Sequence, residues 1–152
     1  MNLLSVQWLT KQYPNFKLQD ITFSLPQGRI MGLIGKNGAG KTTTLKSMLN
    51  LVHPNSGTIE MFGQNFISHE ETCKQNIGVV LGEVDFYKQK KLSVITAVTK
   101  RFYSGWNEAA YEKYLSAFDL DPKKRVKELS SGLNVKYRVA LSLFQNFLFH
   151  TS

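Results

Sequence analysis

The sequence predicts an α/β protein, with β-strands mostly in its first half and helices in its second half. Segments near the N-terminus alternate apolar and polar residues, as half-buried strands do. Beyond residue 90 the apolar residues recur at helical spacing, and between these regions a glycine-rich loop joins a short apolar run to an amphipathic stretch. We expect residues 1–152 to form a single domain, with a helical subdomain at about residues 88–130.

The first half predicts, in chain order, a hairpin of strands over 3–9 and 18–25, a buried strand over 29–35, a helix over 41–52, and strands over 58–63 and 76–82. The hairpin turns at YPNF, where Pro and Asn favour a turn. Residues 29–35 (RIMGLIG) are too apolar for either face of the strand to meet water. The helix ends at HPNSG, because Pro and Gly follow its last apolar residue.

The second half predicts helices over 92–106, 107–120 and 129–147. The middle helix places Tyr111, Tyr114, Leu115 and Phe118 on one face, which identifies the side that packs against a core. Because strands precede these helices, we expect an α/β core with a helical insertion.

The composition is that of an ordinary globular protein, with 42% hydrophobic and 20% charged residues. The formal net charge is +8, from 19 Lys+Arg and 11 Asp+Glu, but the basic residues are scattered. The densest run, PKKRVK at 122–127, is interpreted as a solvated face, so we expect no nucleic-acid partner. No run approaches the roughly 18 to 20 apolar residues of a membrane helix, and the N-terminus does not resemble a signal peptide.

A phosphate-binding loop follows the apolar run. Gly35, Gly40, Lys41 and Thr42 match the pattern G-x-x-x-x-G-K-[ST] without a gap. Glycines let successive backbone N–H groups turn toward phosphate oxygens, and the following helix adds its positive end. Lys41 supplies a full charge to the β- and γ-phosphates, and the Thr42 hydroxyl is placed to ligate Mg²⁺. The predicted ATP-binding residues of the loop are Gly35, Asn37, Gly38, Ala39, Gly40, Lys41, Thr42 and Thr43.

Residues 32–63 (GLIGKNGAGKTTTLKSMLNLVHPNSGTIEMFG) resemble the nucleotide-binding subunit of ABC transporters. ELSSGL at 128–133 resembles that family's LSGGQ signature, in the form found among ABC-2-type exporters and antimicrobial-peptide resistance pumps. The resemblance covers nearly all of residues 3–143. It implies a P-loop NTPase (RecA-like) core with an N-terminal antiparallel β subdomain and a helical subdomain.

The resemblance implies two further contacts with nucleotide. Ser130, Ser131 and Gly132 would close over the γ-phosphate of ATP held by a second domain, although Ser and Gly at a helix start also fit a simple N-cap. Tyr13 is the candidate adenine platform, because aromatic faces stack on bases. Phe16 competes for that role, and Tyr13 also fits an ordinary residue of a hairpin turn.

The sequence departs from the family in two places. Gly82 stands where the family carries a Gln that touches Mg²⁺, and the next residue, Glu83, fits either a replacement ligand or a solvated acid. From Leu143 onward we expect no further resemblance, and no acid follows Glu128, so the Walker B Asp and Glu are absent. We therefore expect a C-terminally truncated, marginally stable chain without ATP hydrolysis, consistent with a shifted reading frame.

The remaining reactive residues are assigned no chemistry. His53 is expected to be structural, and His150 is not the family's switch His because nothing around it matches. His69 and Cys73 have no partners at metal-ligand spacing, so we expect no metal site made by protein ligands alone. As the one cysteine, Cys73 also excludes an internal disulfide.

The function expected from the resemblance is that of an ATP-binding subunit of an ABC exporter, using ATP and Mg²⁺. Its partners would be a second nucleotide-binding domain, in a homo- or heterodimer, and a transmembrane permease subunit. The chain would be cytoplasmic and peripheral at the inner face of the membrane. One alternative is a non-hydrolysing regulatory fragment that pairs with a full-length ABC subunit. A second alternative is a cytosolic ABC protein acting on ribosomes or DNA.

Overall fold

The computed structural model describes residues 1–80 and 87–143, and the backbone of residues 147–150. The chain divides into two compact units, Met1–Cys73 and Lys74–Ser152, which are described one at a time. None of the helices in the described part of the chain combines the length and the apolar content that crossing a bilayer requires.

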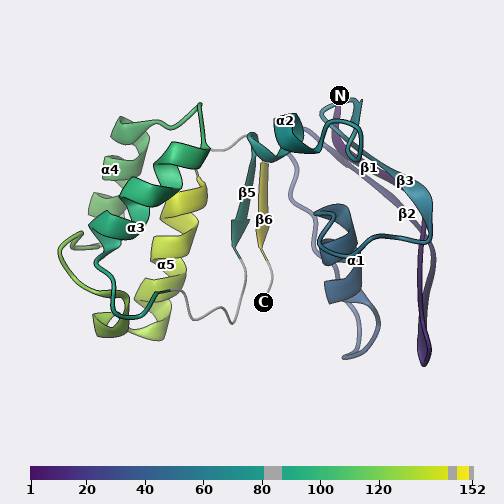
Figure 1. Ribbon diagram of the computed structural model, residues 1–152, viewed down its shortest axis with the longest axis horizontal. Coiled ribbons are helices and arrows are strands. Elements are labelled where there is room, and N and C mark those ends of the chain that lie inside the picture. Colours follow the sequence, from purple (N-terminus) through teal and green to yellow (C-terminus); the bar gives the residue numbers. More distant parts are fainter. Residues whose placement is uncertain (81–86, 144–146, 151–152) are drawn as a thin grey trace. The chain divides into compact units, whose positions relative to one another are not determined.

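The first unit contains a four-stranded antiparallel sheet in the order β2-β1-β3-β4 and the helix that follows the phosphate loop (Figure 1). Its elements are β1 (Asn2–Tyr13), β2 (Phe16–Pro26), α1 (Lys41–Met48), β3 (Ser56–Met61), β4 (Gln64–Asn65) and most of the short helix α2 (Glu70–Lys74). The predicted hairpin is confirmed, with Tyr13 paired to Phe16 across its turn. The buried side chains of this unit's core include Leu4, Val6, Leu9, Leu18, Met48, Ile59, Met61 and Phe66.

Helix α1 ends at Met48, four residues before the predicted end at 52. Asn50 adopts a left-handed conformation with φ of 55°, which stops the helix there. The backbone N–H groups of Leu51 and Val52 then donate to the Lys46 carbonyl oxygen, at 2.9 and 3.3 Å. The helix was predicted to reach residue 52 because Val52 continues the helical spacing of Leu45, Met48 and Leu49. A residue in the left-handed region, such as Asn50, cannot continue a helix.

The prediction of a buried strand over 29–35 is wrong. Residues 29–36 belong to no strand of the described chain, and the side chains of Ile30 and Ile34 are 101% and 98% exposed. A strand exists only where another strand pairs with its N–H and C=O groups, and neither sheet in the described residues includes this segment. The apolar composition of the segment favours burial of its side chains, but it does not supply a neighbouring strand to pair with its backbone.

The second unit holds helices at the places predicted for the second half and a two-stranded parallel sheet (Figure 1). The helix predicted over 92–106 is shorter than expected, because its α-helical part ends at Thr99 and a 3₁₀ turn ends at Phe102. Its elements are β5 (Ile77–Val80), α3 (Leu92–Thr99), the 3₁₀ helix η1 (Lys100–Phe102), α4 (Glu108–Ala117), the 3₁₀ helix η2 (Val126–Glu128), α5 (Ser131–Ser142) and β6 (Phe147–His150). The core of this unit is formed by the buried residues Leu92, Tyr111, Leu120, Val126, Tyr137 and Ala140.

Three buried hydroxyl groups join the helices inside this core. The Tyr137 hydroxyl donates to the Leu92 carbonyl oxygen at 2.9 Å, and the Thr96 Oγ1 lies 3.1 Å from it and 2.6 Å from the Tyr111 hydroxyl oxygen. Because the Tyr137 hydroxyl donates its one proton to Leu92, the Thr96 hydroxyl donates to Tyr137 and the Tyr111 hydroxyl donates to Thr96. This series of hydrogen bonds connects α3, α4 and α5. It gives each buried hydroxyl a hydrogen-bond partner, without which its burial would destabilise the fold.

Strand β6 also differs from expectation, because Phe147, the last residue of the helix predicted over 129–147, opens this strand. Helix α5 ends at Ser142, and residues 147–150 pair in parallel with β5, Ile77 with Phe147 and Val80 with His150. The apolar run Phe147, Leu148, Phe149 is the sequence signal, since strands of parallel sheets are near-continuously apolar. Helical spacing and a short apolar run are hard to separate in a sequence, and the pairing partner decided the outcome.

Candidate nucleotide-binding site

The phosphate loop ends in a tight turn stabilised by two glycines in the left-handed region. Gly38 has φ of 83° and Gly40 has φ of 92°. The Ala39 N–H donates to the Lys36 carbonyl oxygen at 3.1 Å, and Gly40 is the N-cap residue of α1. Residues with side chains rarely adopt such φ values, so both glycines are needed for the loop to reach the helix in this way.

The Lys41 ammonium lies over the loop. Its Nζ is 2.6 Å from the Gly35 carbonyl oxygen and 3.1 Å from the Lys36 carbonyl oxygen. These two bonds place a full positive charge at the entrance to the helix, against the backbone that the glycines turn. An anion at this point would meet the charge directly.

The start of α1 adds further donors. The first intrahelical bond runs from the Thr44 N–H to the Gly40 carbonyl oxygen at 2.8 Å, so the N–H groups of Lys41, Thr42 and Thr43 precede it. The buried Thr44 hydroxyl donates to the same carbonyl at 2.9 Å. The first turn contains no acidic residue. The positive end of the helix is therefore not neutralised by its own side chains.

The structure places the two candidate aromatic residues beside each other at the turn of the β1–β2 hairpin. The ring centroids of Tyr13 and Phe16 are 6.4 Å apart, and the Lys11 Nζ lies 5.4 Å from the Tyr13 ring centroid. Phe16 is half-buried and packs against Gly40, whereas Tyr13 is 38% exposed. Of the two rings, Tyr13 has more surface available to a base.

The three signature residues lie at the start of α5, in the unit Lys74–Ser152. Ser130 is the N-cap, and its Oγ accepts from the Leu133 N–H at 3.2 Å. Ser131 and Gly132 form the first turn and are exposed, and a Cβ added to Gly132 would meet no atom within 4 Å. The Ser130 hydroxyl thus serves as a helix cap in this structure, and the open surface at Gly132 leaves room for a close approach.

Of the other residues considered from the sequence, Gly82 and Glu83 lie outside the described residues. His53 fastens the segment after α1, because its Nδ1 is 2.7 Å from Asn50 Oδ1 and its carbonyl oxygen accepts from the Lys11 Nζ at 2.7 Å. His69 Nδ1 lies 3.1 Å from the Asn65 carbonyl oxygen. Cys73 is buried, and this burial raises the pKa of its thiol. Both histidines are held by neighbouring backbone or amide groups.

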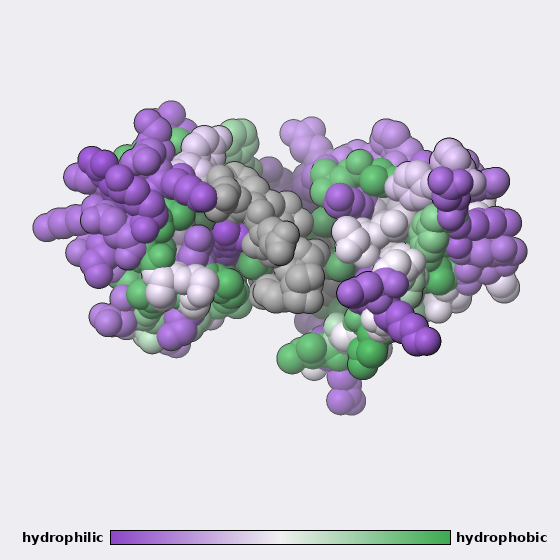
Figure 2. Space-filling model, turned by 90° about the horizontal axis from the view of Figure 1, so that it is seen from below, coloured by the Kyte–Doolittle hydropathy of each residue, from purple (hydrophilic) through white to green (hydrophobic). Residues whose placement is uncertain are grey.

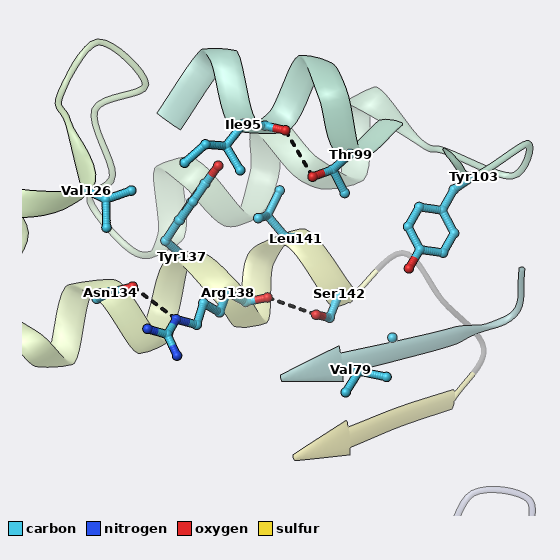
Figure 3. Close-up of a pocket in the computed structure, with 11 residues that line it drawn as sticks. Val79, Ile95, Thr99, Tyr103, Val126, Asn134, Tyr137, Arg138, Leu141 and Ser142 are labelled. Atoms are coloured by element: carbon cyan, nitrogen blue, oxygen red, sulfur yellow. Dashed lines mark hydrogen bonds between the residues drawn. The ribbon is translucent and has the colours of Figure 1, made fainter. Parts of the chain in front are cut away.

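A separate cavity of about 320 Å³ lies in the second unit, between β5 and the helices α3 and α5 (Figure 3). Its apolar wall includes Val79, Ile95 and Leu141. Three of its polar side chains bond within their own helices: Thr99 Oγ1 to the Ile95 carbonyl, Arg138 Nε to Asn134 Oδ1, and Ser142 Oγ to the Arg138 carbonyl (Figure 3). No predicted nucleotide-binding residue lines this cavity, so it is not the site predicted from the sequence.

The chain resembles proteins of known transport systems. It is 30% identical over 141 residues to the Bacitracin transport ATP-binding protein BcrA of Enterococcus faecalis, covering 92% of this chain and 46% of the relative. The protein of the same name from Bacillus licheniformis is 32% identical over 138 residues, covering 89% of this chain and 45% of the relative. Nod factor export ATP-binding protein I of Ralstonia nicotianae is 30% identical over 155 residues, with coverage of 95% and 47%. The chain therefore spans about half the length of these relatives.

Solved structures share the fold. A structure of an ATP-binding subunit of an ABC transporter matches with a TM-score of 0.81 and 28% identity, over 93% of this chain and 62% of that chain. An ABC transporter ATP-binding protein from Pyrococcus furiosus matches with a TM-score of 0.78 and 25% identity, over 97% of this chain and 72% of that chain. The predicted P-loop NTPase fold with an N-terminal antiparallel β sheet is thereby confirmed.

Residues 18–149 match the family described as ABC transporter. The match extends beyond Leu143 and includes most of β6, which corrects the expectation that the resemblance ends at Leu143. With a phosphate loop opening α1, a capped signature opening α5 and a family match over most of its length, the chain belongs to the ABC transporter family.

Proposed function

We propose that residues 35–43 bind the triphosphate of ATP, with Mg²⁺ held in part by the Thr42 hydroxyl. The observation that carries the proposal is the Lys41 ammonium, which lies 2.6 Å from the Gly35 carbonyl oxygen above the glycine turns. The first-turn N–H groups of α1 and the absence of an acid from that turn favour an anion in the same place. The exposed Thr42 hydroxyl supplies an oxygen ligand of the kind that Mg²⁺ takes.

The adenine base is assigned to Tyr13. Phe16 is held by its contact with Gly40, so Tyr13 is the ring with a face left for stacking. Ser130, Ser131 and Gly132 are assigned to the γ-phosphate of ATP bound by a second nucleotide-binding domain. The support for this assignment is the exposed start of α5, where N–H groups, a hydroxyl and the positive helix end coincide.

At the level of the whole protein, the proposed role is that of the ATP-binding subunit of an exporter. ATP binding and hydrolysis would be coupled to transport through a permease subunit, which would hold the protein at the cytoplasmic face of the membrane. The relatives named for bacitracin transport and Nod factor export support this role. Pairing would occur with an identical or a homologous nucleotide-binding domain.

The test is binding of a fluorescent ATP analogue to the wild-type chain and to Lys41→Ala. Loss of the ammonium should weaken binding at least tenfold, or about 1.4 kcal/mol. Lys46→Ala is the matched control, because Lys46 is exposed on the same helix and its removal changes the net charge equally. The control should bind as the wild type does.

Equal affinity in the wild type and Lys41→Ala would overturn the assignment of the loop. Equal weakening in Lys41→Ala and Lys46→Ala would show that net charge, rather than the position of Lys41, attracts the nucleotide. Circular dichroism of each variant establishes that the fold is retained.

A further inference from the structure

Two basic segments that are far apart in the sequence lie side by side in the second unit. Lys91 and Arg125 form an antiparallel bridge. The Val126 N–H donates to the Lys90 carbonyl oxygen at 3.1 Å, and the Leu92 N–H donates to the Lys124 carbonyl oxygen at 3.0 Å. These backbone bonds join the run that precedes α3 to the run that precedes α5. What the sequence shows as two short basic stretches is one surface in the fold.

We call this the basic surface, and it comprises Lys90, Lys91, Lys123, Lys124, Arg125 and Lys127, all exposed. No salt bridge joins any of the six to a carboxylate within the residues that the structure describes. The two acids of these segments are engaged by backbone: Asp121 accepts from the Lys123 N–H and Glu128 from the Arg125 N–H. The surface therefore presents six cationic side chains, and its two carboxylates are hydrogen-bonded to backbone N–H groups of the same segment.

The basic surface is not shaped as a pocket for one phosphate group. The first amides of α3 are already used, since the Leu92 and Ser93 N–H groups donate to the carbonyl oxygens of Lys124 and Pro122, and the Ile95 N–H donates to that of Lys91. Because these amides are used, an anion would meet mainly side-chain charges here, spread over two adjoining segments of turns and bends. Such an arrangement suits an extended anionic surface better than a single small ligand.

Exposed apolar side chains continue from the basic surface along α3 and η1. Val94, Val98 and Phe102 are 47%, 51% and 69% exposed and recur every four residues, starting three residues after Lys91. Figure 2 shows hydrophilic side chains gathered over this unit, with hydrophobic ones between them. Cationic side chains beside exposed apolar ones are typical of protein segments that bind the surface of an anionic bilayer. Nucleic acid would match the charge but not the apolar row.

We propose that the basic surface binds the anionic headgroups of a lipid bilayer directly. The contact is electrostatic, needs no nucleotide and is separate from any permease partner, so it goes beyond the proposed ATP-binding role. It would orient this unit toward the membrane surface. Five of the six residues are lysines, whose ammonium groups act as point charges toward many headgroups. An arginine guanidinium would instead bind one phosphate through two parallel hydrogen bonds.

The experiment is flotation of the 152-residue chain with vesicles of phosphatidylcholine alone, or of phosphatidylcholine with about 30% phosphatidylglycerol. We expect binding only to the anionic vesicles, and loss of binding at about 1 M salt, where charges are screened within about 3 Å. Each lysine contributes about fivefold, so Lys123→Ala/Lys124→Ala should bind roughly 25-fold more weakly. Lys113→Ala/Lys136→Ala, with the same charge change at exposed sites on α4 and α5, should bind as the wild type does.

Three results would overturn the proposal: equal binding to neutral and anionic vesicles, equal loss in the two double variants, or binding that survives high salt. A single-stranded oligonucleotide that displaces the chain from anionic vesicles at equal phosphate concentration would reassign the basic surface to nucleic acid. ATP-analogue binding, measured on the same proteins, should be unchanged in both double variants. A failure of lipid binding is thereby distinguished from a failure of the nucleotide assignment.

Discussion

The ring of Phe16 lies directly against Gly40. A Cβ placed on Gly40 would stand 2.9 Å from Phe16 Cζ and 2.7 Å from Leu18 Cδ1, closer than real Cβ contacts come. Gly40 also has φ of 92°, where residues with side chains are strained. The β1–β2 hairpin and the phosphate loop therefore fix one another, and glycine is required at position 40 for two independent reasons.

Gly40→Ala is expected to lower the free energy of unfolding by about 2–4 kcal/mol, from backbone strain and overpacking together. Gly38→Ala is the matched control, because its φ is 83° but an added Cβ meets no atom within 4 Å. It should cost only the strain, about 1–2 kcal/mol. Urea unfolding measures both. Equal losses in the two variants would contradict a role for the Phe16 contact.

Tyr13→Ala should weaken binding of ATP and of GTP alike, by about 1–3 kcal/mol, because stacking is tolerant of base identity. Its stability should change little, since Tyr13 is exposed. Phe16→Ala should instead lower the urea midpoint, because the half-buried ring packs on Gly40. Titration with both nucleotides checks the pair. Unchanged binding in Tyr13→Ala, with weaker binding but normal stability in Phe16→Ala, would assign the base to Phe16.

Ser130→Ala should cost about 1 kcal/mol of stability, because the Ser130 Oγ accepts from the Leu133 N–H and caps α5. Ser130→Asn should restore most of the loss, as Asn is an equally good N-cap. The neighbouring Ser131→Ala should stay within about 0.5 kcal/mol of the wild type, since Ser131 is exposed in the first turn. Thermal or urea unfolding of the three variants decides. Equal free energies of unfolding in Ser130→Ala and Ser131→Ala would show that the Ser130 cap does not stabilise α5.

Tyr137→Phe should lower the free energy of unfolding by about 1–3 kcal/mol, because it leaves the buried Leu92 carbonyl and Thr96 hydroxyl without this partner. Burial is the main cause that raises the pKa of the Tyr137 hydroxyl above its ordinary value of 10.0. The folded chain thus holds this proton more tightly than the unfolded chain.

The sign of the pH dependence follows. A folded-state pKa above the unfolded value gives a contribution that is full below about pH 10 and is lost as pH rises further. Wild-type stability should therefore fall between about pH 8 and about pH 11, and it should fall less in Tyr137→Phe. Urea midpoints at the two pH values measure the difference. An identical fall in both proteins would show that other groups account for it.

The sequence by itself determined the local features. The hairpin turn at Pro14 and Asn15, the phosphate loop with Lys41 at its helix start and the N-cap at Ser130 all depend on residues that are neighbours in the chain. Glycine conformations, helix caps and apolar periodicity act over a few residues, so a single sequence contains them.

Only the tertiary structure decided which segments found partners. The apolar segment 29–35 lies in no strand, whereas residues 147–150, of which only Phe147 belonged to the predicted helix, pair with β5. In the same way, Phe16 meets Gly40 and Lys91 meets Arg125 through contacts between residues distant in sequence. The physical reason is that backbone pairing, close packing and the sum of surface charge depend on the second segment as much as on the first.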